Sequence, residues 1–177
     1  MNIKDYIKIE NLIGVGCSRA VYKANNKVIK INLSYLGYLQ TKVEKWFYDI
    51  VQEKFNRSEM FNKVDFINNF FSISDYIEPI SNEYFDITCS DIFNESYYFD
   101  YEDDVIDLAK EFGICTDDWF SASNRAVLDG KLILIDYGMK KSFYPLIEKD
   151  DFSDKSKEEV HNYVLRILKE FNYYKGL

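Results

Sequence analysis

Two glycines and a lysine near the N-terminus have the types and spacing of a phosphate-binding turn. Gly14 and Gly16 lie between two segments rich in β-branched and aromatic residues, and Lys30 follows the apolar pair Val28-Ile29. Because glycine has no Cβ, the backbone of such a turn can come close to a phosphate, with its amides directed at the anionic oxygens. Lys30 would add a cation. The same residues also fit an ordinary hairpin and a surface lysine at the end of an edge strand.

Oxygen-bearing side chains occur at the two ends of a second compact segment. Asp136 follows the most apolar strand of the chain, 132–135, and Asn124 lies just before the same predicted hairpin. Both side chains carry the oxygen ligands that magnesium prefers. Each is also typical of an ordinary turn, because Asn and Asp bond readily to nearby backbone. The pair therefore indicates either a metal site or plain turn chemistry.

Glu44 is the carboxylate best placed in sequence to fix Lys30. It lies beside Val43 and Phe47 in a predicted helix, near the margin of the apolar face, on the element that follows the lysine strand. A phosphate-binding lysine needs such an acidic partner. A glutamate on a helix is otherwise typical of a solvated face.

The elements that would position these residues follow from hydrophobic periodicity and turn signals. The first half is predicted to be β-rich with a single helix, and the second half to be mostly helical with one small hairpin. A capping box of Ser156 and Glu159 marks the start of the last helix. Strands and hairpins are predicted within 7–30, 64–67, 70–77 and 127–135, and helices within 38–52, 103–112 and 156–172.

These elements predict an α+β protein of one domain in two parts, residues 1–79 and 80–177. The boundary falls near 78–81, because Pro79 lacks the amide that a strand would need to continue. Residues 81–101 are aromatic and acidic, and we expect a loop with a short helix there.

Composition excludes several classes of function. The formal net charge of −8 disfavours nucleic-acid binding, which needs a basic surface. Three widely spaced cysteines (Cys17, Cys89 and Cys115) and a single histidine cannot assemble a common zinc set, and an odd cysteine count favours a reducing cytosol. No stretch approaches the roughly 20 apolar residues that span a bilayer, and the N-terminus has no apolar signal region. We expect a soluble, cytoplasmic protein with no nucleic-acid or membrane partner.

Taken in order, the motifs resemble those of the protein-kinase-like superfamily. The stretch Ser18-Arg19-x-Val21-Tyr22 is similar to that of small bacterial and bacteriophage kinase-like proteins. The resemblance covers about residues 7–140. Gly14-x-Gly16-x-x-Arg19-x-Val21 resembles the glycine-rich loop, with Arg19 in place of the third glycine, and Asp136-Tyr137-Gly138 resembles the metal-binding Asp-Phe-Gly. The resemblance implies a two-lobe fold, with an antiparallel N-lobe sheet, one helix and a reduced, mostly helical C-lobe.

The resemblance also implies an ATP and Mg²⁺ site in the cleft between the lobes. The glycine loop, the strand lysine and a hinge resembled by Ser74 to Pro79 would hold the nucleotide, which assigns it Gly14, Gly16, Ser18, Lys30, Asp75 and Tyr76. Asn124 and Asp136 would hold magnesium. The catalytic residues would be Asp118, which orients the acceptor hydroxyl, together with Lys30 and the Glu44 that fixes it.

Two departures from the family pattern leave the activity open between two classes. The family places its catalytic Asp five residues before the Asn, and that position is Trp119, with Asp118 one residue earlier. Only 39 residues follow Gly138, without an Ala-Pro-Glu, so little chain remains for a peptide platform. One reading is an enzyme that phosphorylates a protein or a small-molecule hydroxyl. The other is an inactive pseudokinase that binds or inhibits a protein partner, with Tyr97 to Asp104 as a candidate surface.

Overall fold

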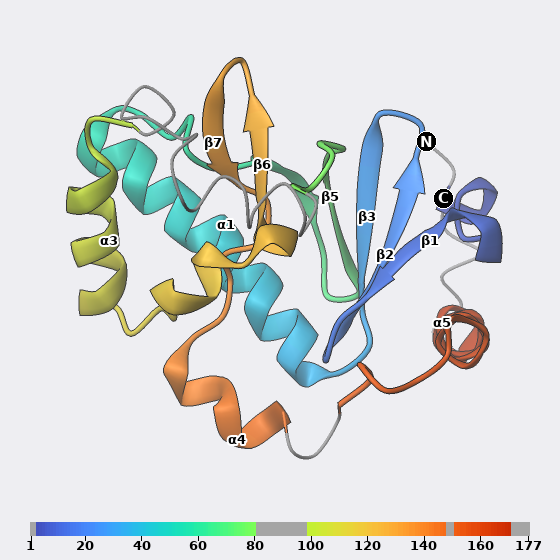
Figure 1. Ribbon diagram of the computed structural model, residues 1–177. Helices are drawn as coiled ribbons and strands as arrows, with labels where there is room; N and C mark the ends of the chain where they lie inside the picture. Colours follow the sequence, from blue (N-terminus) through green and yellow to red (C-terminus); the bar gives the residue numbers. More distant parts are fainter. Residues whose placement is uncertain (1–2, 81–98, 148–150, 171–177) are drawn as a thin grey trace. The chain divides into compact units, whose positions relative to one another are not determined.

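β-branched and aromatic residues in the N-terminal part form a five-stranded antiparallel sheet with the order β1-β2-β3-β5-β4 (Figure 1). The computed structural model describes residues 3–80, 99–147 and 151–170. A long helix follows β3, and the chain then adds β5 beside β3 and β4 at the edge of the sheet, beside β5. The bounds are β1 Leu12–Val15, β2 Arg19–Ala24, β3 Lys27–Asn32, α1 Tyr35–Phe55, β4 Val64–Ile67 and β5 Phe71–Asp75.

The rest of the described chain is mostly helical and contains one two-stranded hairpin. Two 3₁₀ turns, Thr116–Phe120 and Ala122–Asn124, lead directly into that hairpin. The regular elements are α3 Glu102–Glu111, β6 Arg125–Leu128, β7 Lys131–Leu134, α4 Tyr144–Ile147 and α5 Lys157–Glu170. The predicted α+β class, with an antiparallel sheet in the first half, is therefore confirmed.

Residue contacts divide the chain into two units. The first comprises Met1–Thr41, Val64–Tyr76 and Phe143–Leu177, and the second comprises Lys42–Lys63 and Ile77–Ser142. The main differences from the predicted parts 1–79 and 80–177 concern α1 and the C-terminal segment. Most of α1 belongs to the second unit, although it lies within the predicted first part. The C-terminal segment with α5 belongs to the first unit, which contains the five-stranded sheet.

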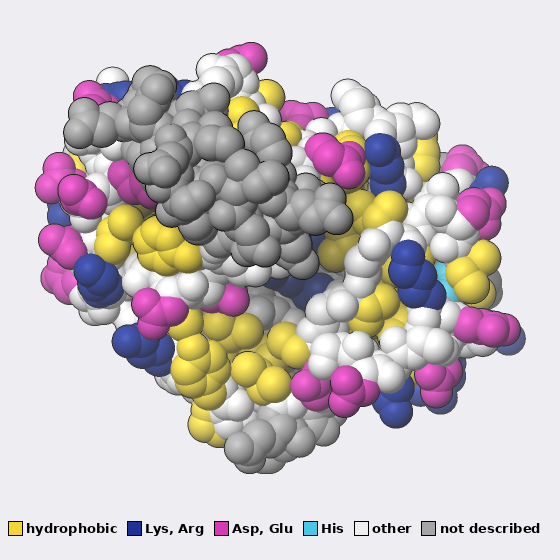
Figure 2. Space-filling view, viewed as in Figure 1, with side chains coloured by type: hydrophobic (Ala, Val, Ile, Leu, Met, Phe, Trp, Pro, Cys, Tyr) yellow, Lys and Arg dark blue, Asp and Glu magenta, His cyan; other side chains and the backbone are white. Residues whose placement is uncertain are grey.

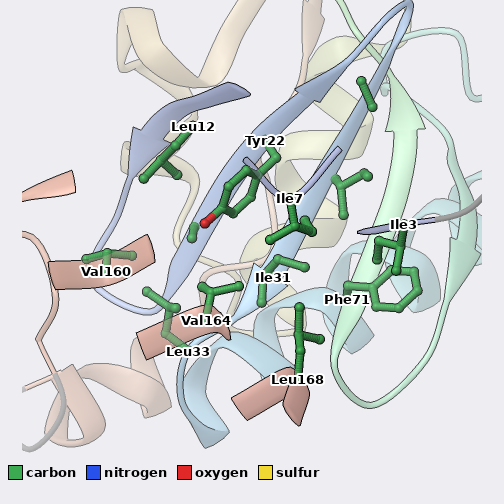
Figure 3. Packing of buried hydrophobic residues seen from close by; sticks show 13 residues of the cluster. Ile3, Ile7, Leu12, Tyr22, Ile31, Leu33, Phe71, Val160, Val164 and Leu168 are labelled. Atoms are coloured by element: carbon green, nitrogen blue, oxygen red, sulfur yellow. The ribbon is translucent and has the colours of Figure 1, made fainter. Parts of the chain in front are cut away.

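The core of the first unit lies between the sheet and α5. Tyr22, Ile29 and Ile31 are fully buried on one sheet face, and α5 presents Val160, Val164 and Leu168 to the same cluster (Figure 3). The predicted capping box starts α5. The Ser156 hydroxyl accepts from the Glu159 amide at 3.2 Å, and a Glu159 carboxylate oxygen accepts from the Ser156 amide at 2.9 Å.

The core of the second unit is aromatic. The Phe47 ring of α1 packs edge-on against Phe61 at 5.8 Å between centroids, and Trp119 lies 5.9 Å from both rings. Tyr137 adds a fourth ring, 4.7 Å from Phe61. These contacts join α1 to the 3₁₀ turn that contains Trp119 and to the segment that follows β7.

Several predicted features lie partly or wholly outside the described residues. These are the loop with a short helix expected over 81–101, of which 81–98 are not described, the start of the candidate surface at Tyr97, and the end of the last helix beyond Glu170. The described part of the candidate surface, from residue 99 on, packs against neighbouring residues. Asp100 forms an ion pair with Arg57, and Tyr101 is buried.

Charged side chains of both signs are mixed over the face of the molecule in Figure 2, rather than gathered in a block of one sign. Within the described part of the chain, no helix combines the length and the apolar composition needed to cross a membrane.

Candidate functional site

Lys30 lies in the middle of the sheet, on the face opposite α5. Its strand, β3, has a neighbour on each side, and Lys30 is paired with Val21 on β2 and Ser72 on β5. Directly paired residues share a face, and successive residues of a strand alternate between faces. Since Ile29 and Ile31 point into the α5 core, Lys30 points away from it. The alternative of an exposed lysine on an edge strand is wrong, because β3 is central and Lys30 is only 6% exposed.

The face that carries Lys30 also carries the first predicted glycine. Gly14 is paired with Val21, which in turn is paired with Lys30. Val28 lies two residues before Lys30 on β3 and therefore shares its face. The structure thus brings Gly14 and Lys30 into one row across three strands, with two valines beside them.

The glycine turn itself closes the β1–β2 hairpin, where the Gly16 amide donates to the Arg19 oxygen at 2.9 Å. A Cβ added to Gly14 would lie 3.9 Å from the Val21 Cβ, and one added to Gly16 would lie 3.8 Å from the Arg19 oxygen. Both are ordinary contact distances, and neither glycine has a positive φ. The protein's own packing therefore does not require glycine at these two positions.

Ser18 links the glycine turn to the start of α1. Its side chain is buried, and its hydroxyl donates to the Gln40 side-chain oxygen. Its backbone oxygen accepts from the Leu33 amide at 2.8 Å. In this arrangement the Ser18 hydroxyl holds the turn against the helix, whereas the family resemblance implied that Ser18 binds the nucleotide.

The predicted hinge residues are tied to the β2–β3 turn. Asp75 forms an ion pair with Lys27 at 2.7 Å, and the Tyr76 amide donates to the Asn26 oxygen at 2.8 Å. Hydrogen bonds to Asp65 and Asp75 raise the pKa of Lys27. The chain that follows β5 is thereby fixed at the end of the sheet, next to the turn between β2 and β3.

In the second unit, the β6–β7 hairpin brings the two predicted metal ligands to the same end. Arg125 and Leu134 are paired at the open end of the hairpin, and the Ile135 amide donates to the Asn124 backbone oxygen at 2.9 Å. Asp136 is the next residue. At the other end, Asp129 and Gly130 have φ values of 50° and 76°, which is the geometry of a tight two-residue turn.

The loop before this hairpin brings Asp118 and Asn124 together. The Asn124 side-chain nitrogen donates to the Asp118 backbone oxygen at 2.9 Å. Trp119 occupies the position where the family pattern expects an aspartate, but its side chain is fully buried against Phe47 and Phe61. The half-buried Asp118 is therefore the acidic residue that this loop links to Asn124, through its backbone oxygen. Its catalytic role stays a prediction.

Glu44 lies in the same unit as the Asp-Tyr-Gly segment, and its side chain is only 1% exposed. Burial raises the pKa of the Tyr137 hydroxyl well above its usual value, and the negative charge of Glu44 raises it further. The Tyr137 hydroxyl donates to the Asn62 backbone oxygen at 3.1 Å. Glu44 is thus close enough to the segment to act on it electrostatically. The ion pair predicted between Lys30 and Glu44 joins residues of different units and stays a prediction.

The residues around the hairpin fit a magnesium ion that is coordinated partly by the protein and partly by phosphate oxygens. The Asn124 side-chain nitrogen donates to Asp118, and its Oδ1 remains as an acceptor, which among the described residues takes a bond from the Ser123 hydroxyl at 3.4 Å. Asp136 adds a half-buried carboxylate. Magnesium commonly takes one or two protein oxygens and completes its shell with water and substrate phosphates. The described residues contain no cluster of three or more His, Cys, Asp or Glu that would hold a metal without such help.

Comparison with known proteins gives a distant likeness in structure. No family model matches the chain, and no curated protein matches it. Among solved structures, the chain is similar to a streptomycin–ATP–APH(2")-IIa ternary complex at 15% sequence identity and a TM-score of 0.43, over 96% of this chain and 82% of that one. A likeness at this level carries no inference about the ligands or activity of this chain.

Two features of the sites were not found from the sequence. Gly37, in the first turn of α1, lets the helix approach the glycine turn, and a glycine inside a helical pattern is the signal that would have suggested a close packing contact. The second feature is the buried ion pair between Glu102 and Arg125, which contacts the Asp118–Asn124 loop through the Arg125 bond to the Trp119 backbone oxygen. Only the charge of Arg125 at the start of an apolar strand hinted at a buried partner.

Proposed function

We propose that this chain is a minimal kinase-like protein that binds ATP with Mg²⁺ and transfers the terminal phosphoryl group to a hydroxyl. The observation that carries the proposal is the β6–β7 hairpin, which brings Asn124 and Asp136 to one end, with Asp118 held beside Asn124. Side-chain oxygens at these three places are what a phosphoryl-transfer site requires. The order of the motifs along the chain supports the same conclusion.

The first unit would bind the nucleotide through the sheet face that carries Lys30. The turn at Gly14 and Gly16 would direct backbone amides at the phosphates, and Lys30 would neutralise their charge. Val21 and Val28, on the same face, would offer an apolar surface to the base. Asp75 and Tyr76 would contribute from the end of β5, while Ser18 would act through its backbone, since its hydroxyl donates to Gln40.

In the second unit, Asn124 and Asp136 would hold the metal, which when bound neutralises charge that develops on the phosphates. Glu44 would orient Lys30. Asp118 would accept the proton of the acceptor hydroxyl and aim that oxygen at the phosphoryl group. The Asn124 side chain would keep Asp118 in place through the 2.9 Å bond to its backbone oxygen.

Thermal unfolding with and without Mg-ATP tests nucleotide binding. A ligand at about 100 times its Kd stabilises the folded state by about 2.7 kcal/mol, which raises the Tm of a chain of this size by about 5–11 °C. Asp136→Ala should lose most of this shift. Asp107→Ala, which removes an exposed carboxylate from α3 in the same unit, should keep it. Equal shifts in wild type and Asp136→Ala would refute the metal assignment, and no shift in wild type at millimolar Mg-ATP would refute the whole proposal.

Transfer of labelled phosphate, to water or to added hydroxyl acceptors, tests catalysis. Asp118→Asn should reduce the rate by on the order of 10²–10⁴-fold, because a positioned general base contributes about that much. Asp117→Asn is the matched control, since Asp117 is the exposed neighbour in the same 3₁₀ turn. Full activity in Asp118→Asn would remove Asp118 from the mechanism.

One observation favours a second candidate function, a pseudokinase that binds nucleotide and acts through a protein partner. Trp119 fills the expected position of the catalytic aspartate and is part of the core. A Mg-ATP shift in wild type without any phosphate transfer would support this alternative, whereas transfer that depends on Asp118 would exclude it.

A further inference from the structure

A single guanidinium group, that of Arg125, connects the Asp118–Asn124 loop to the start of α3. Arg125 is the first residue of β6 and is 4% exposed. Its Nε donates to the Trp119 backbone oxygen at 2.8 Å, and its Nη2 donates to Glu102 Oε1 at 3.2 Å. Glu102 is the first residue of α3 and is 7% exposed. The loop is thereby linked to a helix of the same unit through two buried hydrogen bonds.

Short-range hydrogen bonds within the loop set its local conformation. The Ser121 amide donates to the Asp118 oxygen at 3.2 Å, and the Asn124 amide donates to the Ser121 oxygen at 3.0 Å. These short-range bonds form the 3₁₀ turns but do not anchor them to the rest of the unit. Contacts that anchor them include the buried Trp119 ring, the bond from the Ile135 amide to the Asn124 backbone oxygen, and the Arg125 bond to the Trp119 backbone, which also reaches α3 through Glu102.

Stability does not account for this ion pair. Removing two charges from water is costly, and well-packed apolar residues often replace a buried pair without loss of stability. Glu102 Oε2 is also buried without a hydrogen-bond partner among the described residues, which adds to the cost. What the pair offers is direction, because the rigid guanidinium fork sets two donors at fixed angles.

We propose that Arg125, oriented by Glu102, is a positioning residue that holds Asp118 and Asn124 in register for the metal and the acceptor hydroxyl. The inference rests on the proposed function for its catalytic consequence. Its structural part, that the Arg125 fork fixes the loop, stands by itself. Arg125 adjoins Asn124 in sequence and bonds to the residue that follows Asp118, so it acts on both groups without touching either substrate.

The test uses Arg125→Lys, which keeps the positive charge and loses the fork. Amide hydrogen exchange at Ser121 and Asn124 should become faster by about 10-fold or more, while Cys115, whose amide donates to Met139 in the same unit, keeps its rate. The Mg²⁺ concentration for half-maximal transfer should rise by about 10–100-fold, as is usual when a residue that supports a ligand is lost. The KM for ATP at saturating Mg²⁺ should change little. Lys131→Met, on the same hairpin, is the control and should change none of these values.

Glu102→Gln is a second variant that keeps an acceptor for Arg125 and serves if Arg125→Lys does not fold. Because a hydrogen bond to a neutral group is about half as strong as one to a charged group, exchange at Ser121 and Asn124 should rise by about 3-fold or more. Wild-type exchange rates in the folded variant would overturn the inference, as would an unchanged Mg²⁺ requirement in active Arg125→Lys. If wild type binds no Mg-ATP, the proposed function fails, and the exchange rates alone then support or overturn the role of Arg125.

Discussion

Gly37 lies so close to Ser18 that a Cβ added to it would collide with the Ser18 backbone oxygen. The same Cβ would lie 3.1 Å from Arg19 Cγ and 3.2 Å from Asn32 Cα, so the first turn of α1 is pressed onto the ends of β2 and β3. A glycine inside a helix costs about 1 kcal/mol relative to alanine. The close approach of the helix to the glycine turn gives this residue a role in packing.

Gly37→Ala should therefore destabilise the protein, although it improves the helix propensity of α1. The nearest atom is a backbone oxygen, which cannot move without moving the turn, and overpacking of this kind typically costs about 1–3 kcal/mol. Urea unfolding measures the change. A gain of about 1 kcal/mol, as alanine gives in an exposed helix, would show that the contact is not tight.

Gly16→Ala should have the opposite profile, with stability near that of wild type and weaker nucleotide binding. The added Cβ would make only an ordinary contact at 3.8 Å, and Gly16 is exposed, so folding has no reason to suffer. A methyl group at the turn would, however, keep phosphates away from the backbone amides. The Mg-ATP thermal shift should fall well below that of wild type, and an undiminished shift would remove the turn from the proposed site.

The parts of this fold that could be predicted are those set by local chemistry. The Ser156–Glu159 capping box and the Asp129-Gly130 turn were recognisable because a few neighbouring residues fix each of them. The packing of α5 on the N-terminal sheet could not be predicted, because the apolar stripe of a helix does not specify its partner. The burial of Lys30 on a central strand could not be predicted either. Strand order decides whether a strand is central, and contacts between residues distant in sequence set that order.

The candidate site was predictable to the same extent. Local order along the chain placed Asn124 just before and Asp136 just after one hairpin, and the structure has that hairpin. The use of Trp119 as a core residue, which leaves Asp118 beside Asn124, depends on Phe47 and Phe61 from elsewhere in the chain. A count of residues from the family pattern cannot detect such a contact.

Trp119→Ala should be among the most destabilising substitutions in the second unit. The side chain is fully buried between Phe47 and Phe61, and removing a buried aromatic ring typically costs about 3–5 kcal/mol. Trp119→Phe should cost less, partly because the indole nitrogen has no hydrogen-bond partner among the described residues. Trp46→Ala is the natural comparison, since Trp46 is the other tryptophan and is 40% exposed. Equal losses at the two positions, measured by urea unfolding, would contradict the burial of Trp119.

The pH dependence of stability should distinguish Glu102→Gln from wild type. Burial raises the pKa of Glu102 above its usual value of 4.5, and the charge of Arg125 only partly opposes this effect. A carboxyl with a raised folded-state pKa binds its proton more tightly in the folded protein than in the unfolded chain. Its contribution to stability is therefore fully present below pH 4.5 and is lost as the pH rises through the folded pKa.

The glutamine in Glu102→Gln does not titrate. The stability of this variant relative to wild type should therefore increase as the pH is raised from 4 towards neutrality. Urea unfolding of both proteins across that range measures the difference, and other groups that titrate equally in both proteins cancel. At neutral pH the variant should thus be no less stable than wild type, while its loop amides exchange faster. If instead the free energy of unfolding of the variant falls relative to that of wild type as the pH rises, the attraction of Arg125 outweighs the cost of burying Glu102. The ion pair would then stabilise the protein.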